Sequence, residues 1–265
     1  MSSISSNACI CLDSSLLLAD TLQNQEARTR LGVIDSHQRK LKLESYLPIT
    51  VKTECQKRIA NIISFISDTF RNFEREFRTF KSSSNTVLND VDLNDSQFVR
   101  EFFIKNYSLH KKPTSEYELL LRMEEMIVTH LTRMVENINS IPYREFVTTI
   151  GVGINKISTT LSYDFHMRVS VHRVITAKID TALLQRLKSD PALQKTAQKK
   201  PNDLQIICEV EANQREIKKW SILVTLDKND FLNNAAQIEK IAKVNCVDPL
   251  YLLQVLKRLE SVSVT

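Results

Sequence analysis

Glycine is scarce in this chain, with 3 residues in 265. Neither GxGxxG nor GxxxxGK[ST] occurs, so dinucleotide-binding and P-loop proteins, which cradle phosphates with those glycine-rich loops, are not supported. So few glycines also argue against an all-β fold, which needs many tight turns. The GxSxG motif of serine hydrolases is missing as well, and with it the support for that chemistry.

Cysteine and histidine show no pattern of metal binding. None of the five cysteines has zinc-site spacing, and most fall inside apolar patterns, where a free cysteine behaves as a small core residue. The five histidines are scattered along the chain. We therefore expect reduced, buried cysteines and neither a zinc site nor a histidine-based nucleophilic site.

Long apolar runs are absent too. No stretch approaches the roughly 20 residues that a membrane-spanning helix needs. The first residues are rich in serine, lack a basic segment and carry Asp13 at the end of a short apolar run, unlike a signal peptide. These features predict a cytoplasmic protein with no membrane partner. A net charge of +5, with pI near 8.9, suits a polyanionic partner.

What the chain does have is acidic residues placed beside short apolar runs. Asp13 and Asp227 directly follow such runs, Glu54 lies just after one, and Asp203 opens one. In an α/β sheet, the carboxyl ends of the strands are where binding sites lie. Carboxylates that converge there repel each other unless a divalent cation sits between them. The pattern favours magnesium- or manganese-dependent phosphate chemistry.

Four short strings resemble, in the family's order, the acidic motifs of PIN-domain nucleases. The strings are LDSSLLL (12–18), TVKTEC (50–55), NDLQII (202–207) and VTLDKNDF (224–231). A fifth, VNCVDPLYLL (244–253), resembles the closing strand and helix of some members. The resemblance covers roughly the first 60 and the last 70 residues.

The resemblance implies a helix-rich PIN-like α/β domain with a parallel sheet that hydrolyses phosphodiester bonds. It implies that one or two Mg²⁺ or Mn²⁺ ions are held by four acids, namely Asp13, Glu54, Asp203 and Asp227. RNA as the substrate is implied by the resemblance alone. Family members often carry their last acidic pair as Asp-x-Asp-Phe, but here Asp227 and Asp230 have two residues between them. Either of these two can therefore be the last metal ligand.

Other residues near these motifs are candidates for contacting a substrate. Three lysines, Lys195, Lys199 and Lys200, precede Asp203 and either hold phosphates or form a solvated loop. Thr225 either orients a carboxylate or a water molecule, or is simply a β-branched strand residue. Ser14 is a further candidate because it adjoins Asp13.

The acids also have purely structural alternatives. Asp13, Asp203 and Asp230 are residues of the type that caps helix N-termini. Glu54 can be a solvated surface residue that the helix dipole favours. The sequence alone leaves both roles open for each of these positions.

Alternation of strand and helix patterns at both ends of the chain predicts a parallel sheet. We expect strands at 8–12, 221–226 and 244–247, an extended piece at 47–50, and a loop or broken helix over 26–45. We expect helices from Asp13 to about 25 and over 203–218, 230–243 and 249–260.

Between these ends the pattern is helical. Apolar residues at alternating spacings of four and three run from Ile59 to Phe80 and predict a long helix with a heptad seam. Further helices are expected over 96–108, 114–139 and about 147–161. The chain is therefore interpreted as a split PIN-like domain, 1–60 plus 191–265, interrupted by an all-helical insertion, 61–190, of the antiparallel-bundle type.

Two functions are compatible with these patterns. The first is a metal-dependent hydrolase, an endoribonuclease in which the four acids hold the metal. The second is a catalytically weak or inactive PIN-like scaffold that binds RNA or a protein partner, or forms a homo-oligomer, through its helical insertion. Convergence of the four carboxylates within metal-bridging distance would separate the two.

Overall fold

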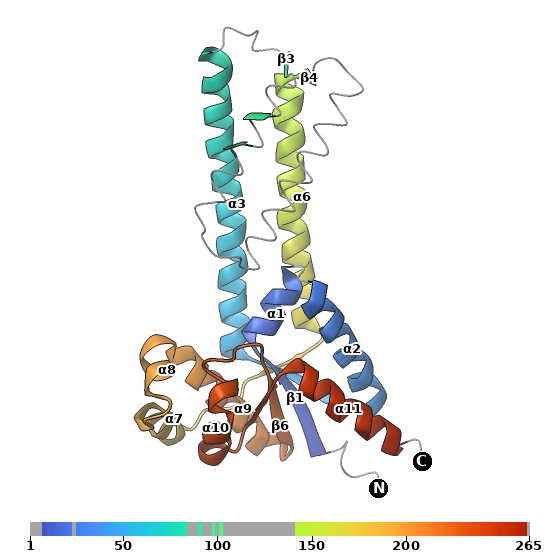
Figure 1. The fold of residues 1–265 in the computed structure, drawn as a ribbon, viewed down its shortest axis with the longest axis vertical. Coiled ribbons are helices and arrows are strands. Elements are labelled where there is room, and N and C mark those ends of the chain that lie inside the picture. Colours follow the sequence, from blue (N-terminus) through green and yellow to red (C-terminus); the bar gives the residue numbers. More distant parts are fainter. Residues whose placement is uncertain are drawn as a thin grey trace. The chain divides into compact units, whose positions relative to one another are not determined.

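The computed structural model describes residues 7–22, 25–83, 90–91, 97–98, 101–102 and 141–263. Contacts between residues divide the chain into two compact units (Figure 1). Unit 1 comprises residues 1–57 and 165–265, and unit 2 comprises residues 58–164. Unit 1 is an α/β structure, and it contains all five strands of the larger sheet.

All neighbouring strands of this sheet are parallel, in the order β5-β2-β1-β6-β7. The strands are β1 (Ala8–Leu12), β2 (Glu44–Pro48), β5 (Arg173–Ile175), β6 (Trp220–Val224) and β7 (Asn245–Val247). The pairing of β1 with β6 runs from Ala8 opposite Trp220 to Leu12 opposite Val224, which confirms that the first and last parts of the chain share one parallel sheet. The strand order reverses between β1 and β6. Sheets of this kind bind ligands at such a point, beyond the carboxyl ends of the strands.

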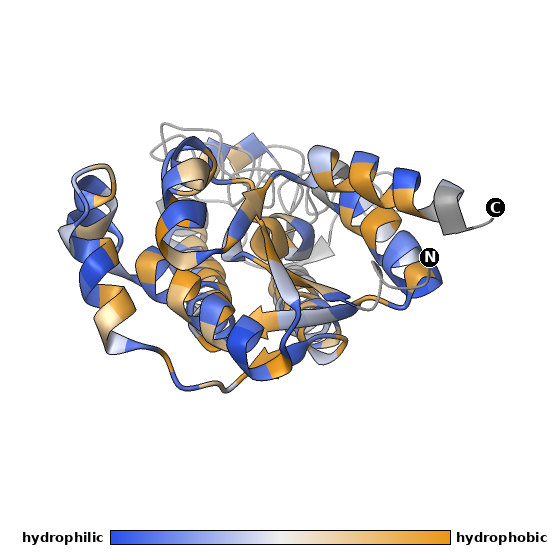
Figure 2. Cartoon of the chain, turned by 90° about the horizontal axis from the view of Figure 1, so that it is seen from below, coloured by the Kyte–Doolittle hydropathy of each residue, from blue (hydrophilic) through white to orange (hydrophobic). Residues whose placement is uncertain are grey.

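Helices cover the sheet because its central strand is apolar on both faces. Cys9 to Leu12 of β1 are all buried, as expected for a parallel strand covered on two sides. On one side α9 (Pro201–Ile217) packs against β2, β5 and β6, and on the other α2 (Gln25–Leu41) packs with α11 (Pro249–Ser263) (Figure 1). In Figure 2, α11 shows hydrophobic and hydrophilic residues in turn along its length, as an amphipathic surface helix does.

Shorter helices complete unit 1. They are α1 (Ser14–Thr21), α7 (Thr181–Ser189), α8 (Gln194–Lys199), the 3-10 turn η2 (Leu232–Asn234) and α10 (Ala235–Ala242). Lysines follow the ends of three helices in the left-handed conformation that glycine usually occupies, namely Lys42, Lys218 and Lys243, with φ of 52°, 55° and 58°. The chain thus ends these helices without glycine, at a steric cost of about 1 kcal/mol each.

Two long helices, α3 (Ile49–Ser83) and α6 (Tyr143–Ser170), have residues in both units. Phenylalanines of the heptad seam meet others in unit 2: the ring centroids of Phe80 and Phe98 are 4.5 Å apart, and those of Phe73 and Phe102 are 5.3 Å apart. Unit 2 also contains the antiparallel pair β3 (Asp90–Val91) and β4 (Ile141–Pro142). The insertion is therefore not all-helical, and strands of two residues are too short to show a period in sequence.

Two further predictions about the elements need correction. The stretch 26–45 is not a loop or broken helix but mostly α2, whose polar sequence hides the inward Leu31 and Ile34. The predicted helix over 114–139 lies outside the described residues, as does most of 96–108. The unit boundaries also differ from the predicted insertion of 61–190, because β5 joins β2 and belongs to unit 1.

Within the part of the chain that is described, no helix combines the length and apolarity that crossing a membrane requires.

Candidate metal centre

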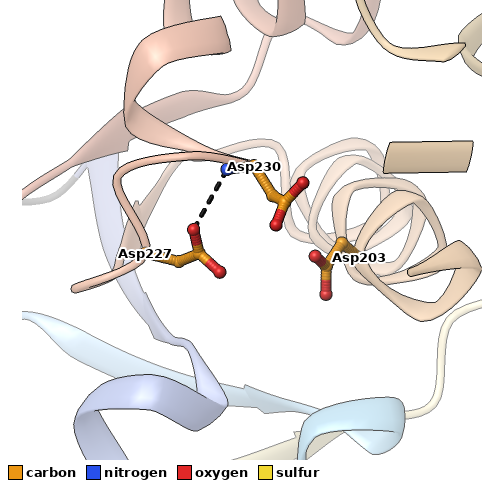
Figure 3. A group of neighbouring side chains, drawn as sticks. All are labelled: Asp203, Asp227 and Asp230. Atoms are coloured by element: carbon orange, nitrogen blue, oxygen red, sulfur yellow. Dashed lines mark hydrogen bonds between the residues drawn. The ribbon is translucent and has the colours of Figure 1, made fainter. Parts of the chain in front are cut away.

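Three aspartates converge beyond the carboxyl end of β6. Asp203 is the third residue of α9, and Asp227 and Asp230 lie in the loop that follows β6. One oxygen of each carboxylate lies within 4.8 Å of the other two, and Figure 3 shows the side chains directed into the same space. We call these three residues the acidic triad. Because hard divalent cations prefer carboxylate oxygens, the triad could hold a metal ion.

The loop after β6 fixes two members of the triad. Asp227 Oδ1 accepts hydrogen bonds from the backbone N–H groups of Asn229 (2.9 Å) and Asp230 (3.0 Å; Figure 3). Asp230 Oδ1 accepts one from the hydroxyl of Thr196 in α8 (2.8 Å). Each carboxylate therefore has one oxygen committed to the fold, and its Oδ2 is left for the centre of the triad.

Lys200, between α8 and α9, contacts both of these remaining oxygens. Its Nζ lies 2.9 Å from Asp227 Oδ2 and 2.6 Å from Asp230 Oδ2. The hydrogen bond to Asp230 is the main reason why the pKa of Lys200 is raised well above its ordinary value. Burial opposes ionisation of Asp227, but the N–H of Asp230 and the ammonium of Lys200 outweigh it, so the pKa of Asp227 is lowered.

Asp203 is held differently. Its side chain is buried, whereas the residue as a whole is half-buried. Its Oδ2 is buried and has no hydrogen-bond partner among the described residues. Burial, followed by the negative charge of Asp13, raises the pKa of Asp203 to about 7. A buried carboxylate oxygen without a partner is uncommon in proteins, and a bound cation would satisfy it.

Asp13 lies outside the triad and has three donors of its own. Its Oδ2 accepts hydrogen bonds from the Ser15 backbone N–H (3.3 Å), the Ser15 hydroxyl (2.6 Å) and the Thr225 hydroxyl (2.8 Å). These contacts cap α1 and tie it to the end of β6. Asp13 therefore acts on the triad through its charge, which raises the pKa of Asp203.

Of the two hydroxyl residues predicted as substrate contacts, Thr225 belongs to this same network. Thr225 is buried and also accepts a hydrogen bond from the N–H of Asp227 (2.9 Å). Ser15, rather than the predicted Ser14, accepts one from the N–H of Leu226 (2.9 Å). Both hydroxyls thus position the loop that carries Asp227. Adjacent serines give no signal in sequence by which the two could be distinguished.

Glu54 is not part of the triad either. It is half-buried on α3, one turn after Thr50. The carboxylate at the start of α3 belongs instead to Glu209 of α9, which is buried and accepts the N–H of Thr50 at 3.0 Å and the amide of Gln205 at 3.2 Å. Nothing in the sequence pattern signals this contact, which joins residues 159 positions apart.

The other two candidate lysines, Lys195 and Lys199, are exposed on α8, the helix that also carries Thr196. Neither forms an ion pair within the described part of the chain. Their charges are therefore accessible to a polyanionic partner.

No family model, no curated protein and no solved structure matches this chain. The resemblance to PIN-domain nucleases therefore stays a prediction, and the chemistry of the triad has to be argued from its own residues.

Proposed function

We propose that the protein is a Mg²⁺- or Mn²⁺-dependent nuclease that hydrolyses RNA, with Asp203, Asp227 and Asp230 as the metal ligands. The observation that carries the proposal is the buried Oδ2 of Asp203, which has no hydrogen-bond partner in the described part of the chain and belongs to a carboxylate facing two others. The reversal of strand order between β1 and β6 supports it, since the triad lies just beyond the end of β6.

The residues present fit such an ion. A bound Mg²⁺ or Mn²⁺ supplies Lewis-acid activation of water and stabilises negative charge at the reacting phosphate. Asp227 and Asp230 would present Oδ2 atoms whose partner oxygens are already fixed by the loop and by Thr196. With a pKa near 7, Asp203 must give up a proton before it can coordinate at neutral pH, so binding releases a proton and weakens as the pH falls.

RNA as the substrate draws its support from charge and from the resemblance. The chain carries 36 basic and 31 acidic side chains, and exposed lysines of α8 precede the triad. Contacts between lysines and phosphates supply affinity without sequence preference and weaken with salt. Lys195 and Lys199 would bind the RNA backbone beside the metal.

The scaffold remains the second candidate because one observation favours it. Lys200 already pairs with two of the three carboxylates, so the triad has a cation of its own without any metal. In that case RNA or a partner protein would bind without cleavage, and unit 2 would be the working surface.

Incubation of single-stranded RNA with the purified protein in Mn²⁺, in Mg²⁺ and with a chelator tests the proposal. We expect cleavage only with metal, and a loss of at least about a hundredfold in Asp203→Asn and in Asp227→Asn, because losing a direct ligand costs more than losing a residue that merely orients one. The matched control is Glu216→Gln, an exposed residue on the same helix as Asp203. Cleavage that persists with chelator, or in both aspartate variants, would disprove the assignment. RNA binding without cleavage under any of these conditions would favour the scaffold.

A further inference from the structure

Lys200 occupies a position that couples it to the triad through the backbone as well as through its side chain. It lies between α8 and α9, directly before the proline that begins α9. Its carbonyl oxygen accepts the N–H of Asp203 at 3.0 Å. The same turn of chain therefore places the carboxylate of Asp203 and the ammonium that pairs with Asp227 and Asp230.

The two sides of this ion pair differ in how firmly they are held. Asp227 and Asp230 are anchored by backbone N–H groups and by the buried Thr196. The side chain of Lys200 is 50 % exposed, so its flexible stem can turn toward solvent without disturbing the core. The ammonium of Lys200 also does not satisfy the whole triad, because the buried Oδ2 of Asp203 still lacks a partner among the described residues.

We propose that Lys200 is a built-in counter-cation which a divalent ion displaces from the triad, and that the displaced ammonium then pairs with a phosphate of the RNA. The inference rests on the proposed metal site. Nζ contacts the Oδ2 atoms of Asp227 and Asp230, the oxygens that a cation in the triad would use. Two positive charges sharing those oxygens would repel each other strongly at such short range. Metal binding therefore exchanges one cation for another.

If this exchange occurs, removing the ammonium of Lys200 should strengthen metal binding. A purely structural role for Lys200 would not have that effect. Calorimetric titration of the full chain with Mn²⁺ should show about tenfold tighter binding in Lys200→Met than in the parent, since no ammonium has to be displaced. Lys200→Arg, which keeps the charge, should bind Mn²⁺ like the parent. The control is Lys240→Met, an exposed lysine of α10 in the same unit, which should leave the affinity within about twofold.

The second readout is the affinity for a fluorescent 2′-O-methyl oligoribonucleotide, measured by anisotropy with and without Mn²⁺. In the parent, Mn²⁺ should strengthen RNA binding because it frees Lys200 for a phosphate. Lys200→Met should lose most of this gain even though it binds Mn²⁺ more tightly, and its salt dependence in Mn²⁺ should be shallower.

Tighter Mn²⁺ binding by Lys200→Met, together with a smaller gain in RNA affinity from Mn²⁺, would support the proposal. Equal or weaker Mn²⁺ binding by Lys200→Met, with the parent binding Mn²⁺ well, would overturn this inference and leave the proposed function in place. If neither the parent nor Lys200→Met binds Mn²⁺, the proposed metal site is wrong and this inference falls with it. If Lys200→Met binds Mn²⁺ more tightly but keeps the full gain in RNA affinity from Mn²⁺, the proposed contact between Lys200 and an RNA phosphate is wrong.

Discussion

Unit 1 holds two groups of charged side chains, each of which includes a buried aspartate, and their composition differs. The acidic triad has three carboxylates and one ammonium. The second group, which we call the arginine cluster, consists of Asp20, Asp35, Arg28 and Arg168, with two carboxylates and two guanidinium groups. Arg168 lies 2.5 Å from Asp20 and 3.0 Å from Asp35, and thereby joins α6 to α1 and α2.

The two groups differ in whether each buried carboxylate has a positively charged partner. Burial raises the pKa of both Asp20 and Asp35, and Arg168 counteracts it in each case. At Asp203 burial is reinforced by the like charge of Asp13, and one oxygen has no partner among the described residues. A paired buried charge holds elements together, whereas an unbalanced one signals that a ligand is expected.

Breaking the arginine cluster should have the largest effect on stability. Among the described residues, Arg168→Met leaves the buried carboxylate of Asp20 with Arg28 as its remaining ion-pair partner, 4.0 Å away. We expect the free energy of unfolding to fall by about 3–5 kcal/mol, measured by urea denaturation. Arg186→Met, at an exposed position of α7, is the control and should change it by less than about 0.5 kcal/mol. A loss below about 1 kcal/mol for Arg168→Met would mean that the cluster is not structural.

The excess of negative charge in the triad should affect how the free energy of unfolding depends on pH. The pKa of Asp203 is raised to about 7. The contribution of this residue to the free energy of unfolding is therefore fully present below about pH 4 and is lost as the pH rises through 7. In Asp203→Asn this loss is absent. Without metal, we therefore expect the variant to gain roughly 2 kcal/mol over the parent between pH 4 and pH 8 in denaturant titrations. Glu216→Gln is the control, and a difference that does not change with pH would contradict the prediction.

The difference between variant and parent is the quantity to measure because a second group opposes Asp203. His172 is buried against Ser45, and burial, then the charge of Arg168, lowers its pKa to about 4. A lowered histidine pKa gives stability that is full above about pH 6.5 and is lost as the pH falls toward 4. The slopes of His172 and Asp203 have opposite signs in this window, so the two contributions partly cancel in the parent.

The parts of this site that could be predicted are those that follow from strand patterns, which place residues at the ends of neighbouring strands. The sequence pattern placed Asp13 directly after β1 and Asp227 shortly after β6, and these two strands are neighbours in the sheet as the pattern implied. Asp13, predicted as a metal ligand, nevertheless lies outside the triad. The convergence of Asp203 with Asp227 and Asp230 was predicted in part, since Asp230 was an alternative to Asp227 and both are present. The short apolar runs beside these aspartates were enough to predict their positions at strand ends and at a helix start.

Contacts that depend on how the helices pack could not be predicted. Glu54 and Glu209 are both glutamates on helices, yet only the packing of α9 against the start of α3 decides which one contacts Thr50. Three lysines precede Asp203, and only the turn before α9 directs Lys200 toward the triad. The polar sequence of α2 hid a helix because its stability comes from packing against α11.

The smallest expected effect separates Asp13 from Asp203, two aspartates that the sequence treats alike. Asp13 Oδ2 accepts three hydrogen bonds and caps α1, so its charge is well solvated by the protein. Asp13→Asn should therefore lower the free energy of unfolding by about 1 kcal/mol, whereas Asp203→Asn raises it at neutral and alkaline pH.

The measurement is urea denaturation at pH 8 without metal, with both variants beside the parent. Removing the charge of Asp13 also removes the second largest cause that raises the pKa of Asp203, so metal-induced proton release near pH 7 should shrink in Asp13→Asn. Stabilisation by Asp13→Asn would show that its carboxylate is repelled by the triad rather than held by Ser15 and Thr225. In that case Asp13 would have to be counted among the metal ligands, as the sequence first suggested.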